Sequence, residues 1–149
     1  PYAEFNLGPG KVDLRPDEIM TGIRIPKESY ENTYGHYIKY AMRRAMDIAT
    51  LGCSVNVRLS KSKDSIDRLR IAFGVAAPIP IRSTHAEESA QGHALDAALL
   101  EAVAEGALAD VTPRTSWRAS KEFRLQLVKE LARRATKAAV EKAGGTING

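Results

Sequence analysis

Cysteine is almost absent from this sequence of 149 residues, which contains a single thiol at Cys53. One cysteine excludes an internal disulfide, and it excludes a metal or iron–sulfur site built from four thiolates of this chain. Histidine is also scarce, and His36, His85 and His93 lack the spacing of helical metal ligands. We therefore expect no metal site, and we expect Cys53 to be an inert thiol in the core.

Long apolar runs are missing as well, and the N-terminus lacks the pattern of a signal peptide. The sequence starts at Pro1 rather than at a methionine. These features lead us to expect a cytoplasmic fragment of a longer chain. The composition is that of a folded domain, because 44% of the residues are hydrophobic and 27% are charged. The net charge of +4 suits an anionic partner such as a nucleotide cofactor or a nucleic acid without requiring one.

Alternation of apolar and polar residues predicts the strands, which gather in the first half of the sequence. The clearest segments are 51–59 and 69–75, where every second residue is apolar, and the aromatic segment 34–40 is a third strand. Isoleucines on one face make segment 17–25 a fourth candidate, ended by Pro26. Strands with a single apolar face indicate an antiparallel sheet that is covered on one side.

The second half changes to helical periodicity. A short helix is expected to start at Thr84, whose spacing to Glu87 is that of a capping box. A second helix is predicted over residues 95–109, and a third is predicted to start at an N-cap, Ser120, and to stop at Gly144. Strands followed by helices predict an α+β fold, in which an antiparallel sheet of three to four strands packs against three helices.

The segment Arg43–Val55 places two adjacent arginines and an Asp-Ile pair directly before a predicted core strand. Composition favours an exposed turn whose charges are solvated. The alternative is a rigid loop that contacts a ligand through the apolar side chain of Ile48, the carboxylate of Asp47 and backbone N–H groups. Arg43 and Arg44 would then set a positive potential beside that ligand.

Basic and aromatic residues are interleaved between Arg118 and Lys142, as in some proteins that bind nucleic acid through phosphate contacts and stacking. Acidic residues dilute this charge. We expect Phe123 on the apolar stripe of the last helix, and Arg124, Arg133 and Arg134 on its exposed face. An ordinary solvated helix is therefore favoured over the alternative function, a non-catalytic module that binds nucleic acid or a partner protein through this helix.

No nucleophile–base pair and no pair of acids has a recognisable catalytic spacing. Together, however, four segments resemble the C-terminal half of the FAD-binding subunit of molybdenum hydroxylases, and the similarity is strongest to the xanthine dehydrogenase group. The segments are FNLGPGKVDLRPDEIM (5–20), HYIKYAMRRAMDIA (36–49), RLRIAFGVAAPIPIR (68–82) and RASKEFR (118–124).

This resemblance implies a flavoprotein oxidoreductase component whose FAD lies between a larger N-terminal domain and a smaller C-terminal one. Residues 1–26 would be the tail of the FAD-binding domain, and residues 27–149 would form the flavoprotein C-terminal domain. Electrons would pass from a molybdopterin centre through iron–sulfur clusters, all held by partner subunits or domains, to FAD and then to an acceptor such as NAD. Neither a membrane nor a nucleic acid is expected as a partner.

Carried over position by position, the resemblance implies that Met20, Lys39, Asp47 and Ile48 bind the cofactor. Met20 would pack on the flavin. Lys39 would offer a compact positive charge to a polar edge or phosphate, and Asp47 and Ile48 would lie beside the isoalloxazine ring. Relatives often carry an acidic residue directly before this aspartate, where the sequence has Met46. No catalytic side chain is assigned, and the fragment alone is expected to be inactive.

Overall fold

A four-stranded antiparallel sheet forms the centre of the molecule. The computed structural model describes residues 1–148. The strands pair in chain order: β3 (Tyr34–Tyr40), β4 (Leu51–Leu59), β5 (Ile66–Gly74) and β6 (Ile81–Arg82). The predicted strands 34–40 and 51–59 are confirmed, and the third is confirmed up to Gly74.

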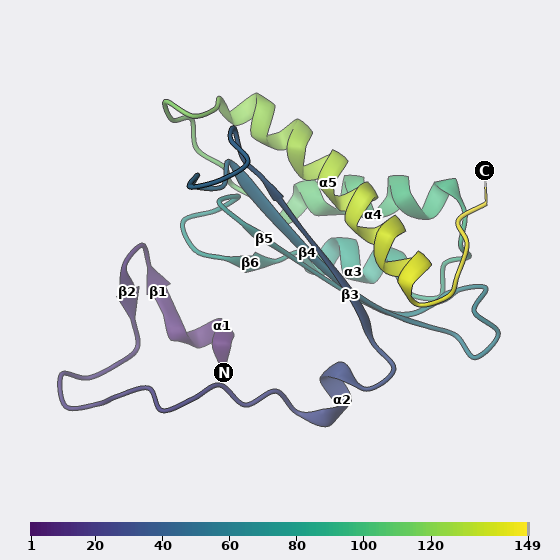
Figure 1. Ribbon diagram of the computed structural model, residues 1–149, viewed down its shortest axis with the longest axis horizontal. Helices are drawn as coiled ribbons and strands as arrows, with labels where there is room; N and C mark the ends of the chain where they lie inside the picture. The colour runs from purple at the N-terminus through teal and green to yellow at the C-terminus, as the bar shows by residue number, and fades with distance from the viewer. Residues whose placement is uncertain (149) are drawn as a thin grey trace.

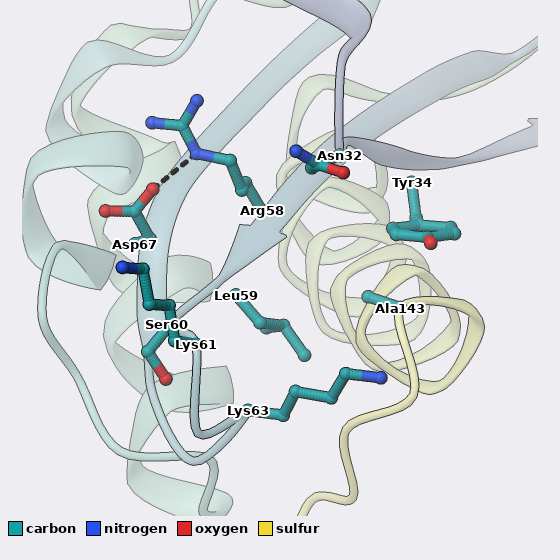
Figure 2. Close-up of a pocket in the computed structure, with 9 residues that line it drawn as sticks. All are labelled: Asn32, Tyr34, Arg58, Leu59, Ser60, Lys61, Lys63, Asp67 and Ala143. Carbon is teal, nitrogen blue, oxygen red and sulfur yellow. Dashed lines mark hydrogen bonds and ion pairs between the residues drawn. The ribbon is translucent and has the colours of Figure 1, made fainter.

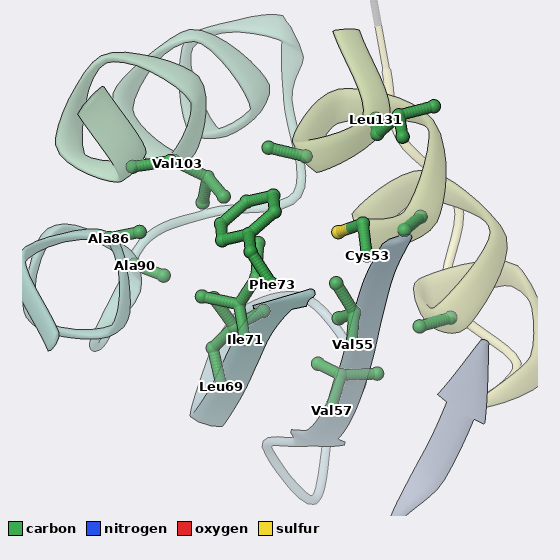
Figure 3. Close-up of a cluster of buried hydrophobic side chains, with 14 of the residues drawn as sticks. Cys53, Val55, Val57, Leu69, Ile71, Phe73, Ala86, Ala90, Val103 and Leu131 are labelled. Atoms are coloured by element: carbon green, nitrogen blue, oxygen red, sulfur yellow. The ribbon is translucent and has the colours of Figure 1, made fainter. Parts of the chain in front are cut away.

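The core lies on one face of this sheet, and it comes from the alternation seen in the sequence. Cys53 pairs with Phe73 in the β4–β5 ladder, and the inward side chains of both strands point to the same side (Figure 3). The inward residues of the two strands are at most 1% exposed: Leu51, Cys53, Val55, Val57, Ile66, Leu69, Ile71 and Phe73. Burying each of the larger ones stabilises the fold by about 1.5–3 kcal/mol.

Three helices cover that face of the sheet (Figure 1): α3 (Thr84–Ala90), α4 (Ala97–Asp110) and α5 (Lys121–Lys142). The predicted α+β fold with three helices is thereby confirmed. Ser120 caps α5 as predicted, since its hydroxyl accepts a hydrogen bond from Phe123 N at 3.2 Å. The chain turns out of α5 at Gly144, whose φ of +84° suits glycine. Within residues 1–148, no helix is long and apolar enough to cross a membrane.

The start of α3 differs from the prediction. Thr84 is the first helical residue rather than the cap, and the side chain of the cap residue, Ser83, makes no capping hydrogen bond, so the predicted capping box is wrong. The residue at the cap position, Ser83, instead donates its hydroxyl to Asp110 Oδ2 at 2.8 Å. Asp110 also accepts from His85 N at 3.0 Å, and its Oδ1 lies 2.7 Å from His85 Nδ1. The last residue of α4 therefore satisfies the first turn of α3, which explains why a local cap is not needed.

The first 33 residues lie apart from the helical layer, on the other side of the sheet (Figure 1). Their short elements are α1 (Tyr2–Phe5), β1 (Asn6–Gly8), β2 (Lys11–Val12) and α2 (Lys27–Tyr30). The strand predicted over residues 17–25 is wrong, because the connection from β2 to α2 contains no strand. Ile19 and Ile23 are 87% and 79% exposed. Their alternation has neither a neighbouring strand to pair with nor a layer to cover it.

Two predictions fail where α5 begins. Val75 was expected to continue the apolar face of β5, but the strand stops before it, and Val75 has a φ of +66° and is 41% exposed. Arg124 was expected on the exposed face of α5, but it is only 2% exposed, whereas its neighbour Phe123 is 41% exposed. The two residues are in contact: Arg124 turns inward to bond backbone carbonyls at the end of the sheet, including that of Val75 at 3.3 Å.

Candidate functional site

The loop from Ala41 to Ala49 joins β3 to β4, and Figure 1 shows it at the end of the sheet where α5 begins. Its base is closed by backbone pairing, because Thr50 N donates to Tyr40 O at 2.8 Å. Thr50 is 1% exposed, so the loop leaves a buried and fixed position. A loop held in this way is an ordered surface rather than a frayed connection.

Asp47 organises the interior of the loop. Its Oδ2 accepts a hydrogen bond from Arg43 N at 2.8 Å, while Arg43 Nη2 donates to Met46 O at 2.8 Å. The backbone N–H of Arg43 is the largest of several contacts that lower the pKa of the Asp47 carboxyl below its ordinary value. Asp47 is therefore a carboxylate at neutral pH, and this carboxylate accepts its hydrogen bond from within the loop.

Lys39 reaches the loop from β3. It pairs with Gly52 in the β3–β4 ladder, and its Nζ donates to Asp47 O at 2.5 Å. Together with residues of the loop, Lys39 and Asp47 line a hollow of about 440 Å³. The ammonium of Lys39, the guanidinium of Arg43 and the side chain of Arg44 make this hollow a place for an anionic or electron-rich group.

Apolar side chains at the tip of the loop point into solvent. Ile48 is 63% exposed and Met46 is 95% exposed. Exposed large apolar residues on an ordered loop offer a surface against which a flat ring can pack. Of the four residues proposed from the sequence, Lys39 and Asp47 are in contact, and Ile48 directly follows Asp47 in the chain. Met20 lies in the β2–α2 connection, which Figure 1 shows away from this loop.

Sequence reasoning missed the residues that contact the two ends of the loop. Arg43 was recognised only as a source of positive potential, although its spacing of four from Asp47 is a common one for a charged pair. Arg124 Nη1 donates to Thr50 O at 2.7 Å, and the rings of Tyr40 and Phe123 meet edge to face with their centroids 6.0 Å apart. The arginine at the end of the RASKEFR segment carried no local sign that it would turn inward.

Another cavity lies at the opposite end of the sheet, beside the β4–β5 hairpin. It has a volume of about 550 Å³, and Figure 2 shows Arg58, Lys61 and Lys63 around it, with Tyr34 on the far side. Arg58 is neutralised by an ion pair with Asp67. The hairpin end therefore has less free positive charge than its composition suggests.

Three of the seven basic residues of α5 are paired with acids. Arg133 Nε donates to Glu101 Oε1 of α4 at 2.7 Å, and Arg134 Nε donates to Glu130 Oε1 at 2.6 Å. Lys129 forms an ion pair with Glu105. Charges that are satisfied within the protein are less available to the phosphates of a nucleic acid.

The fold and the loop define a small α+β domain that presents a hydrogen-bonded β3–β4 loop beside an open hollow. The sequence profile of the CO dehydrogenase flavoprotein C-terminal domain matches residues 36–139. The chain belongs to this family, and the resemblance found in the sequence is confirmed. The match lies inside the predicted domain 27–149, whose boundary at residue 26 stays a prediction.

Individual relatives agree with the family. The chain is 48% identical over 147 residues to the xanthine dehydrogenase FAD-binding subunit of Escherichia coli O157:H7, a match that covers 99% of this chain and 50% of that protein. It is 28% identical to the carbon monoxide dehydrogenase medium chain of Hydrogenophaga pseudoflava, over 93% of this chain and 47% of that one. The chain thus spans about half the length of the curated relatives it matches.

Solved structures share the fold. A carbon monoxide dehydrogenase from Hydrogenophaga pseudoflava that lacks the Mo-pyranopterin moiety of the molybdenum cofactor matches 94% of this chain and 47% of its own, with a TM-score of 0.78 and 26% identity. Quinoline 2-oxidoreductase from Pseudomonas putida 86 matches 94% of this chain and 47% of its own, with a TM-score of 0.81 and 23% identity. At the latter identity the likeness concerns the fold alone.

Proposed function

We propose that this chain is the C-terminal half of the FAD-binding subunit of a xanthine dehydrogenase-like molybdenum hydroxylase, and that its β3–β4 loop forms one wall of the flavin cleft. The observation that carries the proposal is the 48% identity to a xanthine dehydrogenase FAD-binding subunit along 99% of the chain. The geometry of the loop supports it, since an ordered loop presents apolar and cationic side chains beside a hollow of about 440 Å³.

The residues of the loop fit a flavin in their chemistry. Ile48, 63% exposed, offers an apolar surface to a flat aromatic ring. Lys39 already donates to Asp47 O, so it can fix the loop and direct its remaining N–H groups toward a polar edge or phosphate of the cofactor. The Asp47 carboxylate holds the loop in shape. When bound, FAD supplies the electron-accepting chemistry, and the side chains described here hold and orient it.

The exposed N-terminal region fits the proposed division of the chain. Residues 1–26 would close the preceding FAD-binding domain, and residues 27–149 would be the flavoprotein C-terminal domain. Ile19, Met20 and Ile23 are all more than half exposed, which suits burial against the missing half of the subunit. In that setting Met20 would approach the flavin from its own segment rather than from the loop.

The proposal extends to the partners of the whole enzyme. Subunits or domains that carry molybdopterin and iron–sulfur clusters would deliver electrons to FAD, and an acceptor such as NAD would remove them, in the cytoplasm. The alternative function, a nucleic-acid or protein-binding module on α5, is disfavoured by the pairing of Arg133 with Glu101 and of Arg134 with Glu130. It would also leave the hollow beside Lys39 without a role.

The test compares flavin binding by the full-length subunit carrying Lys39→Ala or Ile48→Glu. Both substitutions should weaken FAD binding, by about tenfold or more for Ile48→Glu, because a buried charge against the ring costs more than a lost contact. Lys61→Ala is the matched control, since it removes a lysine at the hairpin cavity and should leave binding unchanged. Equal flavin content and fluorescence in all of these variants would refute the placement of the flavin.

A further inference from the structure

The first turn of α5 holds both base residues of the β3–β4 loop. Phe123 packs its ring edge to face against Tyr40, where β3 ends, with the ring planes at 67°. The next residue, Arg124, donates from Nη1 to the carbonyl of Thr50, where β4 begins, at 2.7 Å. Tyr40 and Thr50 are themselves joined by a backbone hydrogen bond of 2.8 Å. Two adjacent side chains of one helix therefore fix the two ends of one loop.

Arg124 does this from an unusual position for a cation. It is 2% exposed, and it has no carboxylate partner among residues 1–148. Its hydrogen bonds go to neutral acceptors only, which are Thr50 O, Val75 O at 3.3 Å and Ser116 Oγ at 2.9 Å. Burial is the main factor that lowers the pKa of this guanidinium, and Arg114 and Arg118 lower it further by repulsion.

A buried charge without a counter-ion is costly, and an apolar side chain of similar size would fill the same space at less cost. The hydrogen bonds of the Arg124 guanidinium connect separate segments of the chain. They join the start of β4 to Val75, a β-branched residue directly after β5 whose φ of +66° is uncommon for such a side chain. They also reach Ser116, in the segment that leads into α5. Three segments from distant parts of the sequence therefore meet at one side chain.

We propose that Arg124 is the positioning residue of the flavin-facing loop, holding the carbonyl of Thr50 so that Lys39, Asp47 and Ile48 stand in their binding arrangement. The proposal rests on the proposed function. Lys39 immediately precedes Tyr40, and Ile48 lies two residues before Thr50, so a shift of the loop base moves both ends of the proposed site. Arg124 has no direct contact with the cofactor in this account and acts through the loop.

The experiment measures FAD affinity, the flavin midpoint potential and thermal stability for the full-length subunit with Arg124→Met. Methionine keeps the apolar bulk but removes all five N–H donors of the guanidinium, including those that bond carbonyl and hydroxyl oxygens in this pocket. We expect FAD binding to weaken about tenfold, which corresponds to a loop that holds its binding arrangement about a tenth of the time. The midpoint potential should shift as well, because the groups around the ring are displaced.

Val128→Ala is the matched control for general destabilisation. Val128 lies on the same helix and is 0% exposed, but it packs in the core rather than on the loop base. It should lower thermal stability and leave FAD affinity and potential unchanged. If it weakens FAD binding as much as Arg124→Met does at an equal loss of stability, Arg124 has a general structural role and the inference is overturned. Arg124→Lys restores a cation and should recover part of the affinity, and it decides the question if Arg124→Met does not accumulate.

The two proposals fail in different ways. If Lys39→Ala and Ile48→Glu weaken FAD binding while both Arg124 variants bind normally, the inference is wrong and the proposed function stands. If none of these variants changes flavin binding, the loop is not part of the cleft and both proposals fall.

Discussion

Glu87 is the buried acid on which the α3 side of the domain depends, and its replacement by glutamine should be measurable. The carboxylate is 5% exposed. Its Oε1 accepts from Ile71 N at 3.2 Å and from Arg82 Nε at 2.9 Å, and its Oε2 accepts from Arg70 Nη1 at 3.0 Å and from Arg82 Nη2. One side chain of α3 thus bonds a backbone N–H of β5 and the guanidinium groups that leave β5 and β6.

Glutamine has one oxygen to accept with, and its NH2 group would face donors. The variant therefore loses about half of these contacts, including charge-assisted bonds that are each worth about 1.5–3 kcal/mol when unscreened. Arg70 and Arg82 are 48% and 53% exposed, so solvent screens the pairs and reduces the loss to about 1 kcal/mol each. We expect Glu87→Gln to lower the free energy of unfolding by about 2 kcal/mol, or the Tm by about 4–8 °C.

Urea unfolding followed by far-UV circular dichroism measures this loss, with Glu88→Gln as the control. Glu88 is adjacent and exposed, so the same change of charge there should alter stability by less than about 0.5 kcal/mol. A Glu87→Gln variant that unfolds at the same urea concentration as the Glu88→Gln variant would show that these contacts add nothing beyond solvation, and the reasoning would be refuted.

Two further predictions concern titratable groups. Cys53 is 0% exposed and burial raises its pKa to about 12, so a thiol reagent should modify it only as fast as the chain unfolds; prompt labelling of the native chain would contradict this. The hydrogen bond that the protonated imidazole of His85 donates to the Asp110 carboxylate raises the pKa of His85 above its ordinary 6.5, so the pair stabilises the fold fully below that pH and progressively less as the pH rises through the folded-state pKa. His85→Gln should abolish that decline in denaturant titrations carried upward from pH 6.5, and an unchanged pH profile would exclude the pair as its source.

The parts of the fold that followed from the sequence were those set by local pattern. Residues 51–59 alternate with a period of two because the strand buries one face. Its partner, β5, follows after a hairpin, so the pairing is local in sequence. The same alternation in 17–25 predicted a strand that is not formed, because the alternation alone does not show whether a neighbouring strand is present to pair with it. Ser120 could be placed as a helix cap because the donor it satisfies lies three residues further on.

The interior of the site depends on contacts between distant residues, which a single sequence does not reveal. The spacing of Arg43 and Asp47 hinted at their pairing, but the bond from Lys39 to the Asp47 carbonyl depends on how the loop folds back over β3. Arg124 contacts Thr50 across 74 residues of sequence. An arginine in a helix normally faces water, whereas Arg124 turns inward and bonds carbonyls at the end of the sheet.

The order of the strands has a consequence for how the chain is made. Because β3, β4, β5 and β6 pair in chain order through short connections, the sheet can assemble early from local contacts. Its apolar face is covered partly by α5, which follows all four of these strands in the chain and leaves the ribosome after them. During synthesis that face, including Val55 and Phe73, stays open to other apolar surfaces until α5 emerges, and this interval exposes the nascent chain to aggregation and to chaperones.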